Sequence, residues 1–86
     1  MIAHMDTFES GKVMMTQAKP MFLRARTKKE AESAMQLFRD GIDLAHKAFH
    51  QATCPSFAEL YNTAIAKELS YFGNMKFLFE NGKVLH

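Results

Sequence analysis

The longest regular pattern of apolar positions begins after Arg26. Thr27 and Glu30 have the spacing of a capping box, in which the two side chains satisfy free backbone N–H groups at a helix start. Apolar residues then recur at intervals of three and four, the period of one buried helical face: Ala31, Ala34, Met35, Phe38, Ile42, Ala45, Phe49 and Ala52. The pattern predicts a helix from residue 27 to about residue 51, in which Gly41 permits close packing against a neighbour.

A second amphipathic segment follows Pro55, which prevents the first helix from continuing. Ser56 and Glu59 repeat the capping-box spacing, so we expect a helix to begin near Ser56. Gly73-Asn74 provides the left-handed residue that commonly ends a helix. The predicted apolar stripe consists of Phe57, Leu60, Tyr61, Ala64, Ile65, Leu69 and Phe72. A connection of about four residues favours an antiparallel helical hairpin.

Both ends of the chain show the alternation and turn residues of β-hairpins. Residues 75–80 alternate in their apolar positions, and Asn81-Gly82 is a preferred two-residue turn into residues 83–85. Residues 8–14 match residues 79–85 at five of seven positions, which predicts a similar hairpin near the N-terminus. Residues 21–26 alternate in the same way, and Pro20 suits the start of an edge strand because it has no N–H to donate.

These elements predict one compact α+β domain that comprises residues 1–86. The expected order is β-β-β-α-α-β-β, with an antiparallel sheet of about five short strands covered on one face by the helical hairpin. The alternative is a mostly helical domain with frayed hairpins at its ends. Both architectures bury the apolar stripes of the two central helices.

Charge is distributed unevenly along the chain. Eleven Lys and Arg against nine Asp and Glu give a net charge of only +2, which is too small to identify a polyanionic partner by itself. Residues 19–29, however, hold five positive charges and no negative one. The distribution therefore points to one basic segment.

The predicted strand gives that segment a binding geometry. If Met21, Leu23 and Ala25 face the helices, then Phe22, Arg24 and Arg26 share the opposite face. A ring that stacks on bases beside cations that neutralise phosphates is typical of nucleic-acid binding on a sheet. The alternative is a solvated edge that discourages aggregation, with Phe22 in a second core. The expected nucleic-acid-binding residues are Lys12, Lys19, Phe22, Arg24, Arg26, Lys28, Lys29 and Lys83.

A metal site is a weaker interpretation of His46, His50 and Cys54, which follow one another at intervals of four. Pro55 disfavours helical geometry at Cys54, and no acidic residue accompanies the histidines as in His-Glu-x-x-His. We therefore favour a solvated helix face with a buried Cys54, and expect no metal and no other cofactor. Neither a Gly-x-Ser-x-Gly elbow nor a phosphate-binding loop occurs, so an enzyme is the minority interpretation.

Compartment is indicated by what the composition lacks. One cysteine excludes an internal disulfide, which favours a reducing compartment such as the cytoplasm. No apolar run approaches the length needed to span a bilayer, and the first ten residues lack the pattern of a signal peptide. We expect a soluble protein without a membrane partner.

The sequence thus predicts a small non-enzymatic regulatory protein that binds RNA or another polyanion and forms a homodimer. The alternative is a small inhibitor, antitoxin-like or virus-encoded, that docks on and blocks a protein or ribonucleoprotein target. Seven methionines and eight phenylalanines would suit such a surface, because methionine adapts to varied partners.

Overall fold

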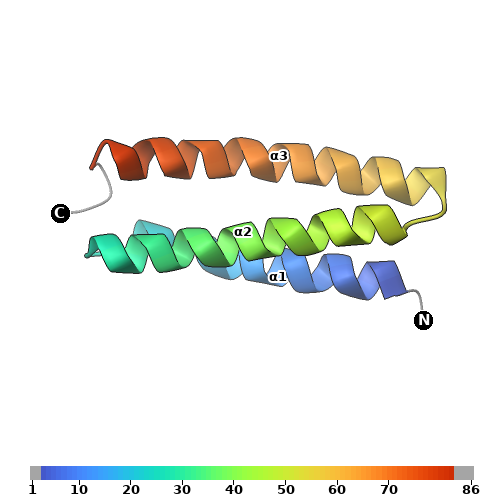
Figure 1. Cartoon of the computed structure of the whole chain (residues 1–86), viewed down its shortest axis with the longest axis horizontal. Coiled ribbons are helices and arrows are strands. Elements are labelled where there is room, and N and C mark those ends of the chain that lie inside the picture. The colour runs from blue at the N-terminus through green and yellow to red at the C-terminus, as the bar shows by residue number, and fades with distance from the viewer. Residues whose placement is uncertain (1–2, 83–86) are drawn as a thin grey trace.

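The computed structural model describes residues 3–82 and consists of three helices joined by short turns (Figure 1). Helix α1 spans Ala3–Leu23, α2 spans Lys28–Gln51 and α3 spans Pro55–Glu80. Successive helices run antiparallel, so α1 and α3 point the same way (Figure 1). The predicted α+β fold is wrong, because no strand occurs among the described residues. The alternative of a mostly helical domain describes the molecule better.

Helix α1 replaces the strands predicted over residues 8–14 and 21–26. Its inward side chains are spaced alternately by four and three residues, and all are buried except the half-buried Phe8: His4, Phe8, Gly11, Met15, Ala18 and Phe22. This is the heptad spacing of a helix that packs along another helix. Burial of the stripe against the other two helices, with Gly11 and Met15 on α2 and His4 and Phe8 on α3, outweighs the weak local preferences of the turn-like and alternating residues.

Pro20 lies inside α1 and not at the edge of a sheet. Proline has no N–H, so the carbonyl of Thr16 loses its helical hydrogen-bond partner there. The helix nevertheless continues to Leu23, and Arg24 N–H donates to the Pro20 carbonyl at 3.0 Å. Because Pro20 is in the last turn, only one hydrogen bond is lost, and it is lost close to the C-terminal end of the helix.

Helix α2 confirms the prediction for residues 27–51. Thr27 is the N-cap, and its hydroxyl oxygen accepts a hydrogen bond of 3.1 Å from the Glu30 backbone N–H. The Thr27 hydroxyl lies 3.4 Å from the Glu30 carboxylate, so the two side chains contact each other directly. An N-cap of this kind stabilises a helix by about 1 kcal/mol.

The α1–α2 seam is built from small residues. A Cβ atom added to Gly11 would lie 2.5 Å from the Gly41 carbonyl oxygen, and one added to Gly41 would lie 2.6 Å from the Gly11 carbonyl oxygen. The predicted role of Gly41 in close packing is therefore confirmed. Alanines continue the seam on both sides and are almost completely buried: Ala18, Ala31, Ala34, Ala45 and Ala48. The two backbones approach closely at Gly11 and Gly41, where neither residue has a side chain.

Helix α3 starts near the predicted position but is longer than predicted. Pro55 occupies its first turn and Cys54 is the N-cap, so the predicted capping box of Ser56 does not form. The helix passes through Gly73 and includes residues 75–80, which were predicted to form a strand. Gly82, with a φ of 67°, follows the helix end as a left-handed residue. The rest of the predicted C-terminal hairpin, residues 83–85, lies outside the described residues.

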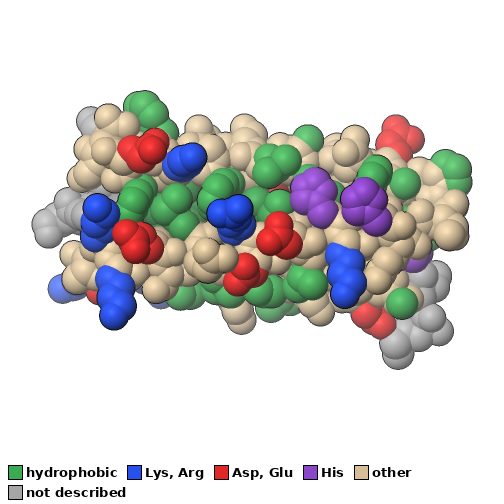
Figure 2. Space-filling model, viewed as in Figure 1, with side chains coloured by type: hydrophobic (Ala, Val, Ile, Leu, Met, Phe, Trp, Pro, Cys, Tyr) green, Lys and Arg blue, Asp and Glu red, His purple; other side chains and the backbone are tan. Residues whose placement is uncertain are grey.

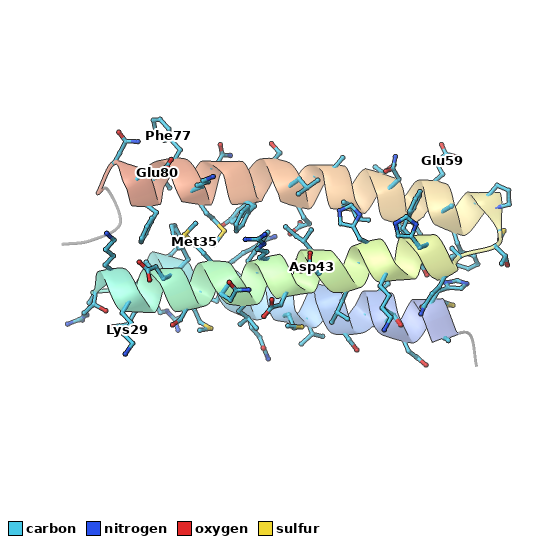
Figure 3. The ribbon with its side chains drawn as sticks, viewed as in Figure 1. Lys29, Met35, Asp43, Glu59, Phe77 and Glu80 are labelled. Atoms are coloured by element: carbon cyan, nitrogen blue, oxygen red, sulfur yellow. The ribbon has the colours of Figure 1, made fainter. Side chains whose placement is uncertain are left out.

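The α2–α3 seam is built from aromatic rings, and it confirms the predicted antiparallel helical hairpin. Phe38 is completely buried and stacks on Tyr71 and Phe72 at centroid distances of 5.6 and 5.9 Å. Met75 and Ile65 of α3 join the same core cluster. Met35 of α2 lies between the two helices (Figure 3). Large side chains therefore hold α3 at a greater distance than small ones hold α1.

Candidate functional site

Four of the predicted cations surround the connection between α1 and α2. We define the basic turn as Arg24, Arg26, Lys28 and Lys29, all of which are exposed. Ala25 is 3% exposed and packs in the core cluster, which anchors the connection and directs its neighbours outward. Lys and Arg side chains gather at this end of the molecule in the space-filling view (Figure 2).

The electrostatic surroundings of the basic turn are mixed. The first turn of α2 adds the partial positive charge of a helix N-terminus. Acidic groups lie close by, because Glu30 follows Lys29 and α3 ends at Glu80 on the same end of the molecule (Figure 3). The Glu30 carboxylate contacts the Thr27 hydroxyl and is thus partly engaged. A shallow hollow that includes Pro20, Arg24 and Lys29 lies beside the turn.

Phe22 does not belong to this surface, so the predicted aromatic platform beside Arg24 and Arg26 is wrong. Its side chain is 1% exposed and is part of the core cluster. The physical reason is the helical period: Phe22 continues the inward stripe of α1, whereas a strand would have placed it opposite the core. The alternative prediction, in which Phe22 is packed in a core, is therefore correct about its burial, although that core is formed between helices and not under a sheet.

The remaining predicted cations lie elsewhere. Lys19 is half-buried, and its Nζ forms an ion pair of 3.3 Å with Glu68 of α3 and lies 4.7 Å from the centre of the Tyr71 ring. Lys12 is exposed on α1, twelve residues before Arg24, which is about 18 Å along a helix. Lys83 lies outside the described residues. The structure thus brings together four of the eight predicted residues.

An apolar groove runs between α1 and α3, with a volume of about 440 Å³. We call it the α1–α3 groove, and its principal apolar lining consists of Met5, Phe8, Met15, Phe57, Leu60 and Tyr61. The ion pair between Lys19 and Glu68 lies at one end. Glu68 Oε2 is buried and receives no hydrogen bond of standard geometry, although it lies 3.3 Å from Lys19 Nζ. This groove was not predicted from the sequence, because the alternating pattern of the α1 residues indicated strands.

A buried polar pair stands at the other end of the groove. His4 Nδ1 lies 2.8 Å from the Tyr61 hydroxyl, and both side chains are at least nine-tenths buried. The Phe57 and Phe8 rings pack against them, with centroid distances of 5.1 Å from Phe57 to His4 and 4.4 Å from Phe8 to Tyr61. Burial raises the pKa of Tyr61, and the negative charge of Glu9 adds to the rise. This pair ties the start of α1 to α3.

The residues of the alternative metal site do not converge. His46 and His50 are exposed on α2, and Cys54 is exposed in the connection to α3, contrary to its predicted burial. Among residues 3–82, no group of three or more His, Cys, Asp or Glu side chains is arranged to hold a metal ion. Backbone hydrogen bonding from Ser56 and then Phe57 lowers the pKa of the Cys54 thiol, although no cap bond of standard geometry forms.

Comparison with known proteins identifies no relative. No family model matches the chain, and neither a curated protein nor a solved structure resembles it significantly. In the part of the chain that the structure describes, no helix is both long and apolar enough to cross a membrane.

Proposed function

We propose that the protein is a small non-enzymatic regulator that binds RNA or another polyanion through its basic turn, and that it acts as a homodimer. The observation that supports binding is the convergence of four exposed cations on one end of the bundle, around the N-terminus of α2. Cations at such a site attract phosphates over a distance comparable to the screening length, about 8–10 Å at physiological salt.

The composition of the basic turn favours contact with the phosphate backbone of a nucleic acid and not recognition of its bases. Phe22 is buried, and Phe79 of α3, whose ring centroid lies 5.9 Å from Lys28 Nζ, is half-buried. Phosphate contacts position a protein on nucleic acid but carry no sequence information. We therefore expect the protein to bind RNA with strong salt dependence and little preference for base sequence.

The salt slope tests this proposal. Four phosphate contacts on a single strand give a slope of log K against log salt of about −2.8, and removal of two cations reduces its magnitude by about 1.4. We expect these values in fluorescence anisotropy titrations of a labelled 20-nucleotide single-stranded RNA with the parent chain and with the double variant Arg24→Ala/Arg26→Ala. The titrations span 50 to 200 mM NaCl, where electrostatic binding changes most steeply.

The matched control is Lys47→Ala/Lys67→Ala, which removes two exposed cations, one near the C-terminal end of α2 and one in the middle of α3, and keeps the same net charge as the test variant. It should retain the parent slope. Equal slopes for both double variants would remove the basic turn as the site, and no RNA binding by the parent at 50 mM NaCl would refute the proposal. A protein-directed inhibitor, which is the alternative function, would instead purify without bound nucleic acid and thus without excess absorbance at 260 nm.

A further inference from the structure

Uncovered apolar side chains occur on the two helices that form the α1–α3 groove. Met5 on the α1 side and Leu60 on the α3 side are 43% and 59% exposed, although both line the groove. Within residues 3–82, the exposed large apolar side chains all belong to α1 and α3: Met5, Val13, Met21, Leu23, Leu60, Leu69 and Phe77. Single exposed apolar residues need no explanation, but an apolar hollow with exposed apolar rims marks a surface that is covered in a complex.

The order of the charged residues Glu9 and Lys12 along the groove indicates which kind of partner can bind there. Glu9 and Lys12 follow Met5 at four and seven residues, so all three lie on one face of α1 and line the groove. Neither Glu9 nor Lys12 forms an ion pair with any described residue; the ion pair found there is that of Lys19 with Glu68. The face therefore presents one free acid and one free base, a single turn apart.

This order is complementary to itself. When two identical helices meet antiparallel about a two-fold axis, residue i of one contacts residue j of the other, and j contacts i. An axis that passes between Glu9 and Lys12 places each Glu9 beside the partner's Lys12. A partner whose surface carries charges of one sign would favour a groove rim of the opposite sign, whereas this rim carries one negative and one positive charge.

We propose that the α1–α3 groove is the interface of a homodimer, in which a second copy of this chain docks antiparallel and each Glu9 pairs with the partner's Lys12. Leu60 of each copy enters the groove of the other and packs on its apolar lining. This inference rests on the homodimer part of the proposed function and is independent of RNA binding. The groove faces used by the two copies are the same, as a closed two-fold dimer requires.

Sedimentation equilibrium of the full chain between 1 and 100 µM tests the interface. We expect a species of twice the 9.8 kDa chain mass. Glu9→Lys sets like charges against each other at two symmetric points, so it should raise the dimer dissociation constant at least about tenfold. The reversed pair Glu9→Lys/Lys12→Glu restores opposite charges and should return the constant to within about threefold of the parent value.

Leu60→Glu tests the apolar contact and should also weaken the dimer at least about tenfold, because a charge would enter an apolar groove. The matched control is Phe77→Glu, which changes a 61% exposed side chain of the same helix that points away from α2 (Figure 3). It should leave the dimer intact. Circular dichroism verifies that each variant keeps its helices, and the reversed charge pair provides a test that does not depend on Leu60.

The outcomes separate this inference from the proposed function. A parent chain that is monomeric at 100 µM overturns both the groove interface and the homodimer. A dimer that neither Glu9→Lys nor Leu60→Glu weakens overturns the groove interface alone, as does failure of the reversed pair to restore the dimer. The RNA salt slope responds to Arg24 and Arg26 in either case.

Discussion

Across the α1–α2 seam two glycine backbones meet, whereas across the α2–α3 seam aromatic rings stack. At the first seam, Gly11 and Gly41 leave no space for even one added carbon atom. At the second, Phe38 is completely buried against Tyr71 and Phe72. The same helix, α2, thus packs by backbone contact on one side and by large side chains on the other.

The difference explains where the molecule leaves surface uncovered. Small residues draw α1 onto α2, and large ones keep α3 at a distance, so α3 packs mainly on α2 and makes few backbone contacts with α1. The α1–α3 groove remains as a result. The two seams are also destabilised by opposite kinds of substitution. A larger residue destabilises the α1–α2 seam, whereas a smaller one destabilises the α2–α3 seam.

Phe38→Ala should break the aromatic seam and has the largest expected effect. Replacing a fully buried Phe by Ala costs about 3–5 kcal/mol, because the transfer free energy of the ring is lost and a cavity remains. We expect this loss in the free energy of unfolding from urea titration followed by circular dichroism. Hydrogen exchange should accelerate more in α3 than in the α1–α2 seam, since Phe38 contacts the rings of α3.

Phe77→Ala is the matched control for this prediction. Its side chain is exposed and points away from the seam, so the change should stay within about 0.5 kcal/mol. If Phe38→Ala costs no more than Phe77→Ala, the aromatic seam does not hold α3. If hydrogen exchange in Phe38→Ala accelerates equally in all three helices, the two seams unfold together as one cooperative unit.

Gly11→Ala should break the small-residue seam with the next largest effect. The new Cβ would lie 2.5 Å from the Gly41 carbonyl oxygen, and backbone on both sides cannot rotate away. We expect a net loss of about 1–3 kcal/mol in unfolding free energy, although alanine favours a helix by about 1 kcal/mol over glycine. Urea titration measures the loss, and a variant as stable as the parent would show that the helices are further apart.

Gly41→Ala sharpens the same prediction. Its Cβ would meet the Gly11 carbonyl oxygen at 2.6 Å and Met15 Cγ at 2.7 Å. Once one alanine has separated the helices, the second finds part of the space it needs. The double variant should therefore lose less stability than the sum of the two single variants, and strict additivity would argue against one shared contact.

The helical hairpin was predictable from sequence because its signals were redundant. Thr27 and Glu30 mark the start of α2, and a long apolar stripe specifies its buried face. Helix α1 was not predicted, because its heptad positions include His4 and Gly11, which do not look apolar. Gly11 also suggested a turn. Its role in close packing depends on Gly41, thirty residues away, and no local pattern contains that information.

The candidate site was predictable only as far as its charge. The basic segment does lie on the surface, because arginine and lysine are exposed in a strand or a helix alike. The position of Phe22 depended on the period of the element, and the wrong period moved its ring from the core to the surface. Lys19 was assigned to the same surface, but a helix turns it toward Glu68.

Gly73→Ala has the smallest expected effect on the free energy of unfolding, and the sign of that effect should be opposite to that of Gly11→Ala in the small-residue seam. Gly73 is helical, and a Cβ added there would meet no atom within 4 Å. Alanine should therefore raise the free energy of unfolding by about 0.5–1 kcal/mol, because it restricts the unfolded chain and favours the helix. A left-handed helix end at Gly73-Asn74, as the sequence suggested, would give a loss instead. A decrease in the urea midpoint would place the end of α3 at Gly73 and detach residues 75–80 from the seam, whereas an increase supports one continuous helix to Glu80.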